Sequence, residues 1–128
     1  MDKVRFNYLY RDAGNYKRWS KVVFPNPDGM PLDAIAESLR AAFLSDGLFI
    51  AHQVRIPEVF FSEEGESTSD DHCFHEFDSV ELYLESSSDV DSRSIAQFIA
   101  EVKQQAKGGW KAFDPRDRSV QSEGPWTF

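Results

Sequence analysis

Hydrophobic and polar residues alternate in two runs near the start of the chain. In the run VRFNYLYR, one face of an extended strand carries Val4, Phe6, Tyr8 and Tyr10, and the other carries Arg5, Asn7, Leu9 and Arg11. The run YKRWSKVVF alternates again, and the turn-forming residues Asp12, Gly14 and Asn15 lie between the two runs. The pattern predicts a β-hairpin over residues 3 to 24, with a loop longer than two residues.

Two later segments carry hydrophobic residues at helical spacing. The first stripe consists of Leu32, Ile35, Ala36, Leu39 and Phe43, with Pro31 suited to the first turn and Gly47 to the C-terminal cap. The second stripe consists of Ile95, Phe98, Ile99, Val102 and Ala106, with Asp91 as the expected N-cap and Gly108 as the expected C-cap. Both segments are predicted to be helices that bury one face.

Extended structure is predicted between the two helices. The segment LFIAHQVRIPEVFF favours one or two short strands interrupted at Pro57, because a residue before proline avoids the helical region. HCFHEFDSVELYLE reads as a long strand bent near Asp78, with Val80, Leu82 and Leu84 on one face and Glu81, Tyr83 and Glu85 on the other. Residues 62–71 are polar and acidic and are expected to form a mobile loop, and residues 110–128 an irregular C-terminal tail.

This order of elements indicates the fold class. A leading hairpin, a helix, short strands, a long strand and a final helix favour an α+β fold with a mainly antiparallel sheet and two helices packed on one face. No repeat or linker divides the sequence, so a single α+β domain over residues 1–128 is expected. A ferredoxin-like arrangement is the alternative.

Composition and charge narrow the classes of protein. The sequence has 128 residues, and 41% of them are hydrophobic. It contains one cysteine and has a formal net charge of −8. A single cysteine forms no internal disulfide, and the start MDKVRFNYLY has no apolar run of signal-peptide length, so a cytoplasmic protein without a membrane segment is expected. The negative charge argues against general nucleic-acid binding, although basic residues concentrate between Lys3 and Lys21 and between Lys103 and Arg118.

The stretch DDHCFHEF, residues 70–77, is the first candidate site. In an extended strand, Cys73 and His75 share one face and His72 and Glu76 the other, so either pair could contribute to a metal site. No second ligand pair at fixed spacing follows, and acidic neighbours oppose a reactive thiolate at Cys73. The favoured interpretation is therefore a strand whose phenylalanines pack in the core. His72, Cys73 and His75 stay as weak metal candidates, and no cofactor is expected.

The hairpin loop in YRDAGNYK, residues 10–17, is the second candidate. Arg11 can grip a phosphate or carboxylate with two hydrogen bonds, Lys17 adds a point charge, and the loop amides add donors. The full set expected to bind a ligand is Arg11, Asp12, Asn15, Tyr16 and Lys17. In the alternative interpretation, Asp12 and Asn15 only form the turn.

Both candidate motifs carry a resemblance. The sequence resembles a family of small bacterial proteins that pair an aromatic-Arg-Asp-x-x-Asn-Tyr-Lys start with a later His-x-x-His-Glu-Phe segment. The matching positions are Tyr10, Arg11, Asp12, Asn15, Tyr16, Lys17, His72, His75, Glu76 and Phe77. The resemblance spans about residues 6 to 78. It implies that the two motifs act together, and it implies no particular reaction.

Three functional hypotheses follow from these motifs. The leading one is a non-enzymatic domain that binds a protein partner or a small anionic ligand. The protein partner could be a second copy of the chain, which would make a homodimer. The second is a small hydrolase or phosphate-handling enzyme with His75 or Glu76 as the catalytic base and Arg11 or Lys17 as the electrostatic stabiliser. The third is an acidic inhibitor or nucleic-acid mimic that binds a basic protein. A candidate interface is added by six aromatic residues, four in the hairpin and two in the tail: Tyr8, Tyr10, Tyr16, Trp19, Trp126 and Phe128.

Overall fold

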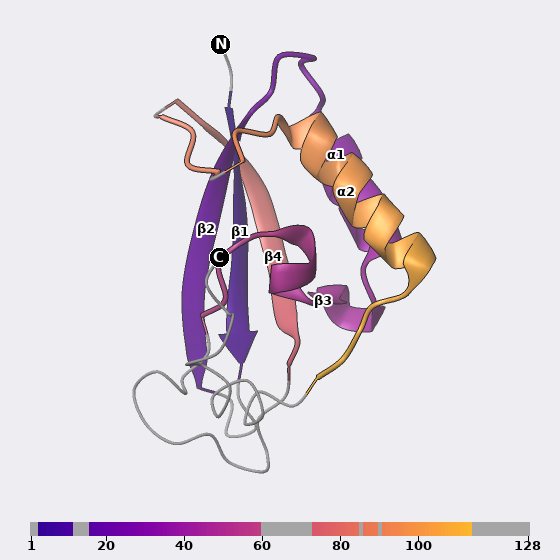
Figure 1. Ribbon diagram of the computed structural model, residues 1–128. Helices are drawn as coiled ribbons and strands as arrows, with labels where there is room; N and C mark the ends of the chain where they lie inside the picture. The colour runs from indigo at the N-terminus through magenta and orange to yellow at the C-terminus, as the bar shows by residue number, and fades with distance from the viewer. Residues whose placement is uncertain (1–2, 12–15, 60–72, 85, 90, 114–128) are drawn as a thin grey trace.

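One antiparallel sheet organises the protein. The computed structural model describes residues 3–11, 16–59, 73–84, 86–89 and 91–113. Its strands are β1 (Lys3–Arg11), β2 (Lys17–Pro25), β3 (Leu48–Phe49) and β4 (His75–Tyr83). They form a four-stranded sheet in the order β2-β1-β4-β3, and each neighbouring pair is antiparallel (Figure 1). The predicted α+β class and the N-terminal hairpin are therefore confirmed.

Both helices lie on the same side of the sheet (Figure 1). They are α1 (Leu32–Ala42) and α2 (Ile95–Gly108), and two single turns of 3₁₀ helix, η1 (Ser45–Gly47) and η2 (Ala51–Val54), flank β3. The expected stripes face the sheet, since Ile35 and Leu39 of α1 and Phe98 and Val102 of α2 are fully buried. We call the sheet face under the helices the inner face, and the opposite one the outer face.

Aromatic rings fill the space between the helices and the inner face. Phe6 of β1 is at the centre of this core, with its ring centroid 5.1 Å from that of Phe98 and 5.3 Å from that of Phe77. Phe24 of β2 stacks on Phe98 at 4.5 Å. Aromatic side chains bury the largest apolar areas and gain further from edge and stacked contacts, so this cluster accounts for much of the stability of the fold.

A β-bulge at Asp78 changes which residues of β4 face inward. The register with β1 runs from Tyr8↔Phe77 to Asn7↔Ser79, which leaves Asp78 as the extra residue. Before the bulge the odd-numbered residue Phe77 packs inward, and after it the even-numbered residue Val80 does. The predicted bend near Asp78 is confirmed. Its consequence is that Glu76 and Glu81, which a regular strand would place on opposite faces, both lie on the outer face.

The C-terminus of α1 differs from the prediction. The helix ends at Ala42, and Phe43 forms its C-cap with an extended backbone that sends its ring into the core. Gly47 instead ends the turn η1 with a positive φ of 74°. A Cβ on Gly47 would lie 3.4 Å from Phe77, so the glycine also allows η1 to approach β4 closely.

Both ends of α2 also differ from the prediction. Ser94, and not Asp91, is the N-cap: its hydroxyl accepts the Gln97 backbone N–H while the Gln97 side chain accepts the Ser94 backbone N–H. At the other end Gly109 is the C-cap with a φ of 97°, and Gly108 is the last helical residue. The sequence carries the capping-box signature Ser-x-x-Gln, which outweighs the isolated Asp91.

A buried ion pair fixes the segment before α2. Arg93 donates to both carboxylate oxygens of Asp89 at 2.8–2.9 Å and to the backbone carbonyl oxygens of Val54 and Arg55. The two side chains are 7% and 1% exposed. Burial alone would raise the pKa of Asp89, but the hydrogen bonds and charge of Arg93 outweigh it and hold that pKa below its usual value.

The other predictions concern connections. Residues 12–15, which make up most of the predicted hairpin loop, lie outside the described residues. The leading pair of strands before α1 differs from the ferredoxin-like order. Before Pro57, LFIAHQV forms the short strand β3 and then the 3₁₀ turn η2, and the segment after Pro57 continues beyond Val59 outside the described residues. The predicted acidic loop at residues 62–71 lies outside the described residues, as does the predicted tail beyond residue 113. Its described start has no regular structure and packs through Trp110, whose indole N–H donates to the Ala42 carbonyl at 3.1 Å.

Candidate functional site

Arg11 and Glu76 meet on the outer face where β1 ends and β4 begins. Glu76 is paired in register with Leu9, two positions before Arg11, which brings the two side chains together across neighbouring strands. The Arg11 Nε lies 3.2 Å from Glu76 Oε1, and Nη2 lies 3.2 Å from Oε2. This two-point contact raises the pKa of Arg11, chiefly through the hydrogen bond to Glu76. The sequence hypothesis that these two residues lie close together is therefore supported.

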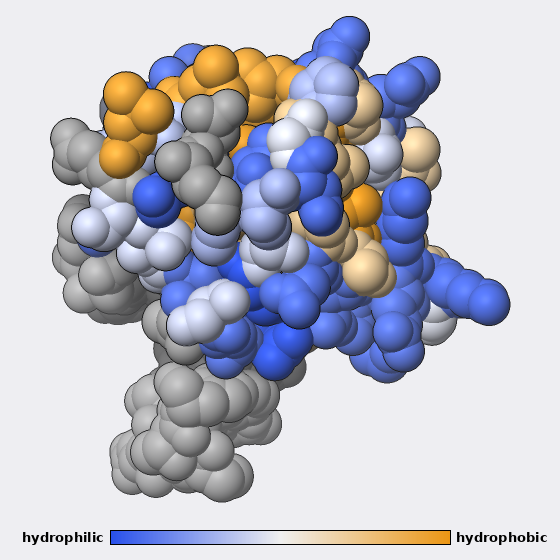
Figure 2. Space-filling view, turned by 90° about the horizontal axis from the view of Figure 1, so that it is seen from above, coloured by the Kyte–Doolittle hydropathy of each residue, from blue (hydrophilic) through white to orange (hydrophobic). Residues whose placement is uncertain are grey.

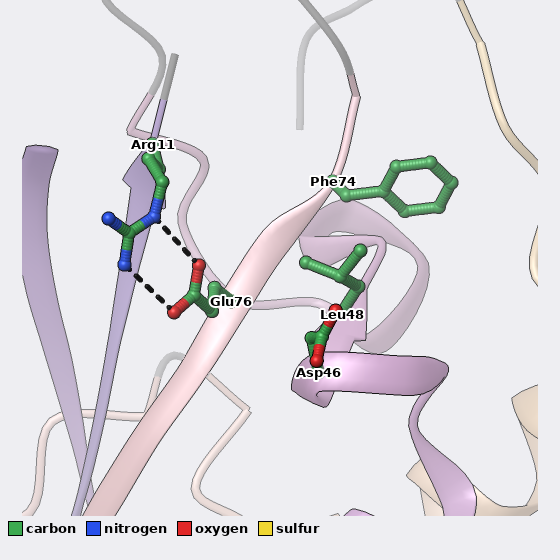
Figure 3. Close-up of a pocket in the computed structure, with 5 residues that line it drawn as sticks. All are labelled: Arg11, Asp46, Leu48, Phe74 and Glu76. Atoms are coloured by element: carbon green, nitrogen blue, oxygen red, sulfur yellow. Dashed lines mark hydrogen bonds and ion pairs between the residues drawn. The ribbon is translucent and has the colours of Figure 1, made fainter. Parts of the chain in front are cut away.

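This pair forms one wall of a pocket of about 520 Å³. The residues that line it are Arg11, Asp46, Leu48, Phe74 and Glu76. Figure 3 shows the Arg11 and Glu76 side chains meeting between β1 and β4, with Leu48 and Asp46 on the side of β3 and η1. One guanidinium and two carboxylates give these lining residues a formal charge of −1. Leu48 and Phe74 supply apolar surface.

Asp46 and Leu48 were not foreseen in this site. Asp46 belongs to η1 and has a left-handed backbone, with a φ of 63°, a conformation that aspartate tolerates better than most residues. Leu48 is in register with Glu76. The tripeptide Ser-Asp-Gly at residues 45–47 is a turn signal that could have shown that the chain leaves the helix here. No local pattern shows that this turn reaches the start of β4.

His75 does not join this pocket. It is fully buried on the inner face, with its ring centroid 5.4 Å from that of Tyr10 and 6.0 Å from that of Tyr8. Its Nε2 accepts the Val59 backbone N–H at 2.9 Å, which requires that this nitrogen carry no proton. The Tyr8 hydroxyl donates to the nearby Pro57 carbonyl at 2.7 Å, and burial raises the pKa of Tyr8 to about 12. These contacts give His75 a structural role in fixing residues 57–59 and separate it from Arg11 and Glu76.

Cys73 is equally remote from solvent. It is 3% exposed, and its Sγ accepts the Phe113 backbone N–H at 3.3 Å. Burial raises the pKa of the thiol, so the neutral form prevails near neutral pH. Among the described residues no group of three or more His, Cys, Asp or Glu side chains could hold a metal ion. His72 lies outside the described residues, so the metal hypothesis stays a prediction.

The remaining hairpin residues divide into two sets. Asp12 and Asn15 lie outside the described residues. Lys17 is the register partner of Arg11 and is exposed on the outer face, and Tyr16 before it is 72% exposed. Trp19, also on the outer face of β2, is 56% exposed, whereas Tyr8 and Tyr10 are buried on the inner face and are not available for an interface. The hairpin therefore presents aromatic and basic side chains beside the pocket, although Lys17 does not line it.

A second acid neutralises the middle of the outer face. Glu81 accepts hydrogen bonds from Arg5 through Nε and Nη2, and from the Asn7 side chain at 2.9 Å. The pKa of Glu81 is lowered first by the hydrogen bond from Asn7 and then by Arg5. The charge of Arg5 is thus compensated within the sheet.

Neither α1 nor α2, nor any other helix in the described part of the chain, has the length and apolar character needed to cross a membrane. The resemblance suggested by the two motifs stays a prediction. Comparison of the chain with protein-family models, with curated proteins and with solved structures gives no match.

Proposed function

We propose that this protein is a non-enzymatic, small-ligand-binding domain, and that the pocket beside Arg11 and Glu76 takes a small amine or zwitterion. One observation carries the proposal: a guanidinium, two carboxylates and two apolar side chains line the same pocket. An ammonium group is attracted by Glu76 and Asp46, and a ligand carboxylate can bind Arg11. An apolar ligand body packs on Leu48 and Phe74. A simple anion fits this place less well, because the described lining residues carry a formal charge of −1.

The catalytic alternative lacks its main residues. A general base must reach the reacting atom, and a nucleophile needs an activating base within hydrogen-bond distance. His75 faces the core through its contact with Val59, and the Cys73 thiol is buried. Glu76, the other candidate base, accepts two hydrogen bonds from Arg11, and the described lining residues include no histidine. The cytoplasmic location expected from the sequence is part of the proposal.

Three matched ligands test the proposal by titration calorimetry. They are leucine, isopentylamine, which lacks the carboxylate, and isocaproate, which lacks the amine. Leucine is expected to bind most tightly and isocaproate most weakly. The Asp46→Asn variant is expected to bind leucine about tenfold more weakly, the equivalent of about 1.4 kcal/mol. The Asp28→Asn variant is the control, because Asp28 is exposed and does not line the pocket. Isocaproate binding as tightly as isopentylamine contradicts the proposal.

A second candidate function is supported by the exposed aromatic residues. Tyr16 and Trp19 are 72% and 56% exposed, and aromatic side chains of this kind are favoured in the centres of protein interfaces. A homodimer through β2, the edge strand, is the simplest form of this function. Sedimentation velocity over a range of concentrations tests it: dimerisation that is lost in Trp19→Ser supports an interface at β2. A monomer at all concentrations contradicts it. The inhibitor or mimic hypothesis stays a prediction.

A further inference from the structure

A second pocket lies on the outer face at the opposite end of the sheet from Arg11. It has a volume of about 650 Å³, and its lining consists of Lys3, Lys21, Val23, Tyr83, Leu84, Ser86, Ser87 and Ser88. Lys3 begins β1 and Tyr83 ends β4, where the two are register partners. Lys3 and Arg11 are at opposite ends of one strand, so about 26 Å of β1 separates these two residues.

The described lining residues of this pocket carry a positive charge, whereas those of the first pocket carry a formal charge of −1. Its described lining has two lysines and no acidic residue. Neither Lys3 nor Lys21 takes part in an ion pair between described residues, whereas Arg5 in the same face is paired with Glu81. Two ammonium groups that form no ion pair with another described residue therefore give this depression a positive potential, in a chain with a formal net charge of −8.

Hydrogen-bond donors form another wall of the pocket. Ser88 is fixed to the edge of β2, since its backbone N–H donates to the Val23 carbonyl at 2.9 Å and its hydroxyl accepts the Val23 N–H at 2.9 Å. The buried carboxylate of the next residue, Asp89, is held by Arg93. The segment is thus fixed at its C-terminal end, and Ser86 and Ser87 are exposed beside the lysines. Serine hydroxyls can turn to donate to an anion.

The floor of the pocket is partly apolar. Val23 is 3% exposed, and Tyr83 and Leu84 complete this surface. The Arg5 guanidinium lies over the Tyr83 ring, 5.2 Å from its centroid, which fixes the ring beside Lys3. Seen from above, hydrophilic residues cover the lower part of the view, and hydrophobic residues lie along its upper border and to the right of its centre (Figure 2).

We infer that this pocket binds the phosphate group of a small phosphate monoester. Lysine ammonium groups act as point charges toward phosphate, and hydroxyls supply directed donors to its oxygens. A monoester carries nearly two negative charges above about pH 7, which matches the two lysines. The organic part of the ester packs on Tyr83 and Val23. This site is independent of the amine pocket at Arg11, and either one can fail without the other.

Titration calorimetry with inorganic phosphate and with phenyl phosphate, at ionic strength matched with sodium chloride, tests the inference. The double variant Lys3→Gln with Lys21→Gln is expected to raise the Kd for both ligands at least about tenfold. The matched control is Lys103→Gln with Lys107→Gln, which removes the same charge from exposed positions on α2 and should leave the Kd unchanged. Thermal unfolding of each variant checks that the fold is intact.

The outcomes separate clearly. Tighter binding of phenyl phosphate than of inorganic phosphate supports an ester whose organic part lies on the apolar floor, and equal binding supports phosphate recognition alone. No binding of either ligand to the wild-type protein overturns the inference. An equal loss of affinity in both double variants also overturns it, because the effect is then one of net charge and not of this pocket. Neither result changes the expected binding of leucine at Arg11.

Discussion

The two ends of the outer face are built from the same strand and differ in how their charges are compensated. At the hairpin end, Arg11 is paired with Glu76, and Asp46 adds a second carboxylate. At the opposite end of the sheet, which we call the open end, Lys3 is the register partner of Tyr83, an uncharged residue. The pocket that Lys3 and Tyr83 line is the open-end pocket. The difference therefore lies in β4, which supplies an acid to each arginine of β1 and an aromatic residue to its lysine. Strand register determines which end attracts amines and which attracts anions.

The bulge at Asp78 is the cause of this arrangement. An extra residue in β4 reverses the inward and outward alternation, so that Glu76 and Glu81 both face outward while Phe77 and Val80 both face the core. In a regular strand one of these acids would point into the aromatic core. The comparison of the two ends depends on this single residue, and the predictions below test it in order of expected effect.

Deletion of Asp78 is expected to have the largest effect. Without the extra residue, one half of β4 must place its polar side chains in the core, because a one-residue slip turns every side chain to the other face. We expect a loss of about 4 kcal/mol or more, a large fraction of the roughly 5 to 15 kcal/mol that stabilises an ordinary domain. Urea unfolding followed by circular dichroism measures it. The Asp78→Ala variant keeps the residue count and should lose less than about 1 kcal/mol, and an equally stable deletion variant contradicts the role of the bulge.

The next largest effect concerns the serine wall of the open end. Asp89→Asn leaves the buried Arg93 guanidinium without its charge partner and should cost about 3 kcal/mol. Because the folded-state pKa of Asp89 is lowered, its stabilising contribution is complete above the unfolded value of about 3.9 and is lost as pH falls through the folded pKa. Urea midpoints of the wild-type and Asp89→Asn proteins should therefore converge below about pH 4. A constant difference down to strong acid contradicts this assignment.

Glu81→Gln should increase the difference in charge between the two ends of the outer face. Removal of this carboxylate leaves the charge of the Arg5 guanidinium uncompensated. Arg5 lies over the ring of Tyr83, and Tyr83 lines the open-end pocket. The affinity for inorganic phosphate should rise about threefold, because the added charge is near the surface and is screened by solvent. Calorimetry at low salt measures the change. A weaker affinity in Glu81→Gln would show that the middle of the face does not act on the open end through charge.

The smallest effect is expected from Lys17→Gln. Lys17 lies beside Arg11 and four positions along β2 from Lys21, or about 13 Å away. This distance exceeds the screening length of about 8 Å at physiological ionic strength. The Kd for phosphate should stay within error of the wild-type value. A loss as large as that of Lys21→Gln would indicate one continuous basic surface in place of a defined pocket.

Local patterns were sufficient to predict the elements that form the core. Alternation over Val4 to Tyr10 predicted β1, and the stripes that contain Leu39 and Phe98 predicted the buried faces of α1 and α2. These predictions are accurate because apolar periodicity and burial follow the same geometry. Helix ends were less accurate, since the Ser94 capping box competes with other acceptable caps nearby.

The candidate site could be predicted only in part. Arg11 and Glu76 were expected to lie close together, but His75 was included with them because sequence proximity does not reveal which face a residue occupies. Alternation places neighbours on opposite faces, and the contact of His75 with Val59 depends on a distant segment. The open-end pocket unites the start of β1, the middle of β2 and residues 83–84 and 86–88. Such a site follows from strand order, which no local pattern contains.

One measurement tests the central claim that the two ends bind opposite charges. Isopentylamine and inorganic phosphate are titrated separately into the same ¹⁵N-labelled protein, and backbone amide shifts are mapped by two-dimensional NMR. The account predicts that the amine shifts the signals of Leu48, Phe74 and Glu76, and that phosphate shifts those of Lys21 and of residues 83–84 and 86–88. Shifts from both ligands at the same end of the sheet, or at exchanged ends, would contradict it.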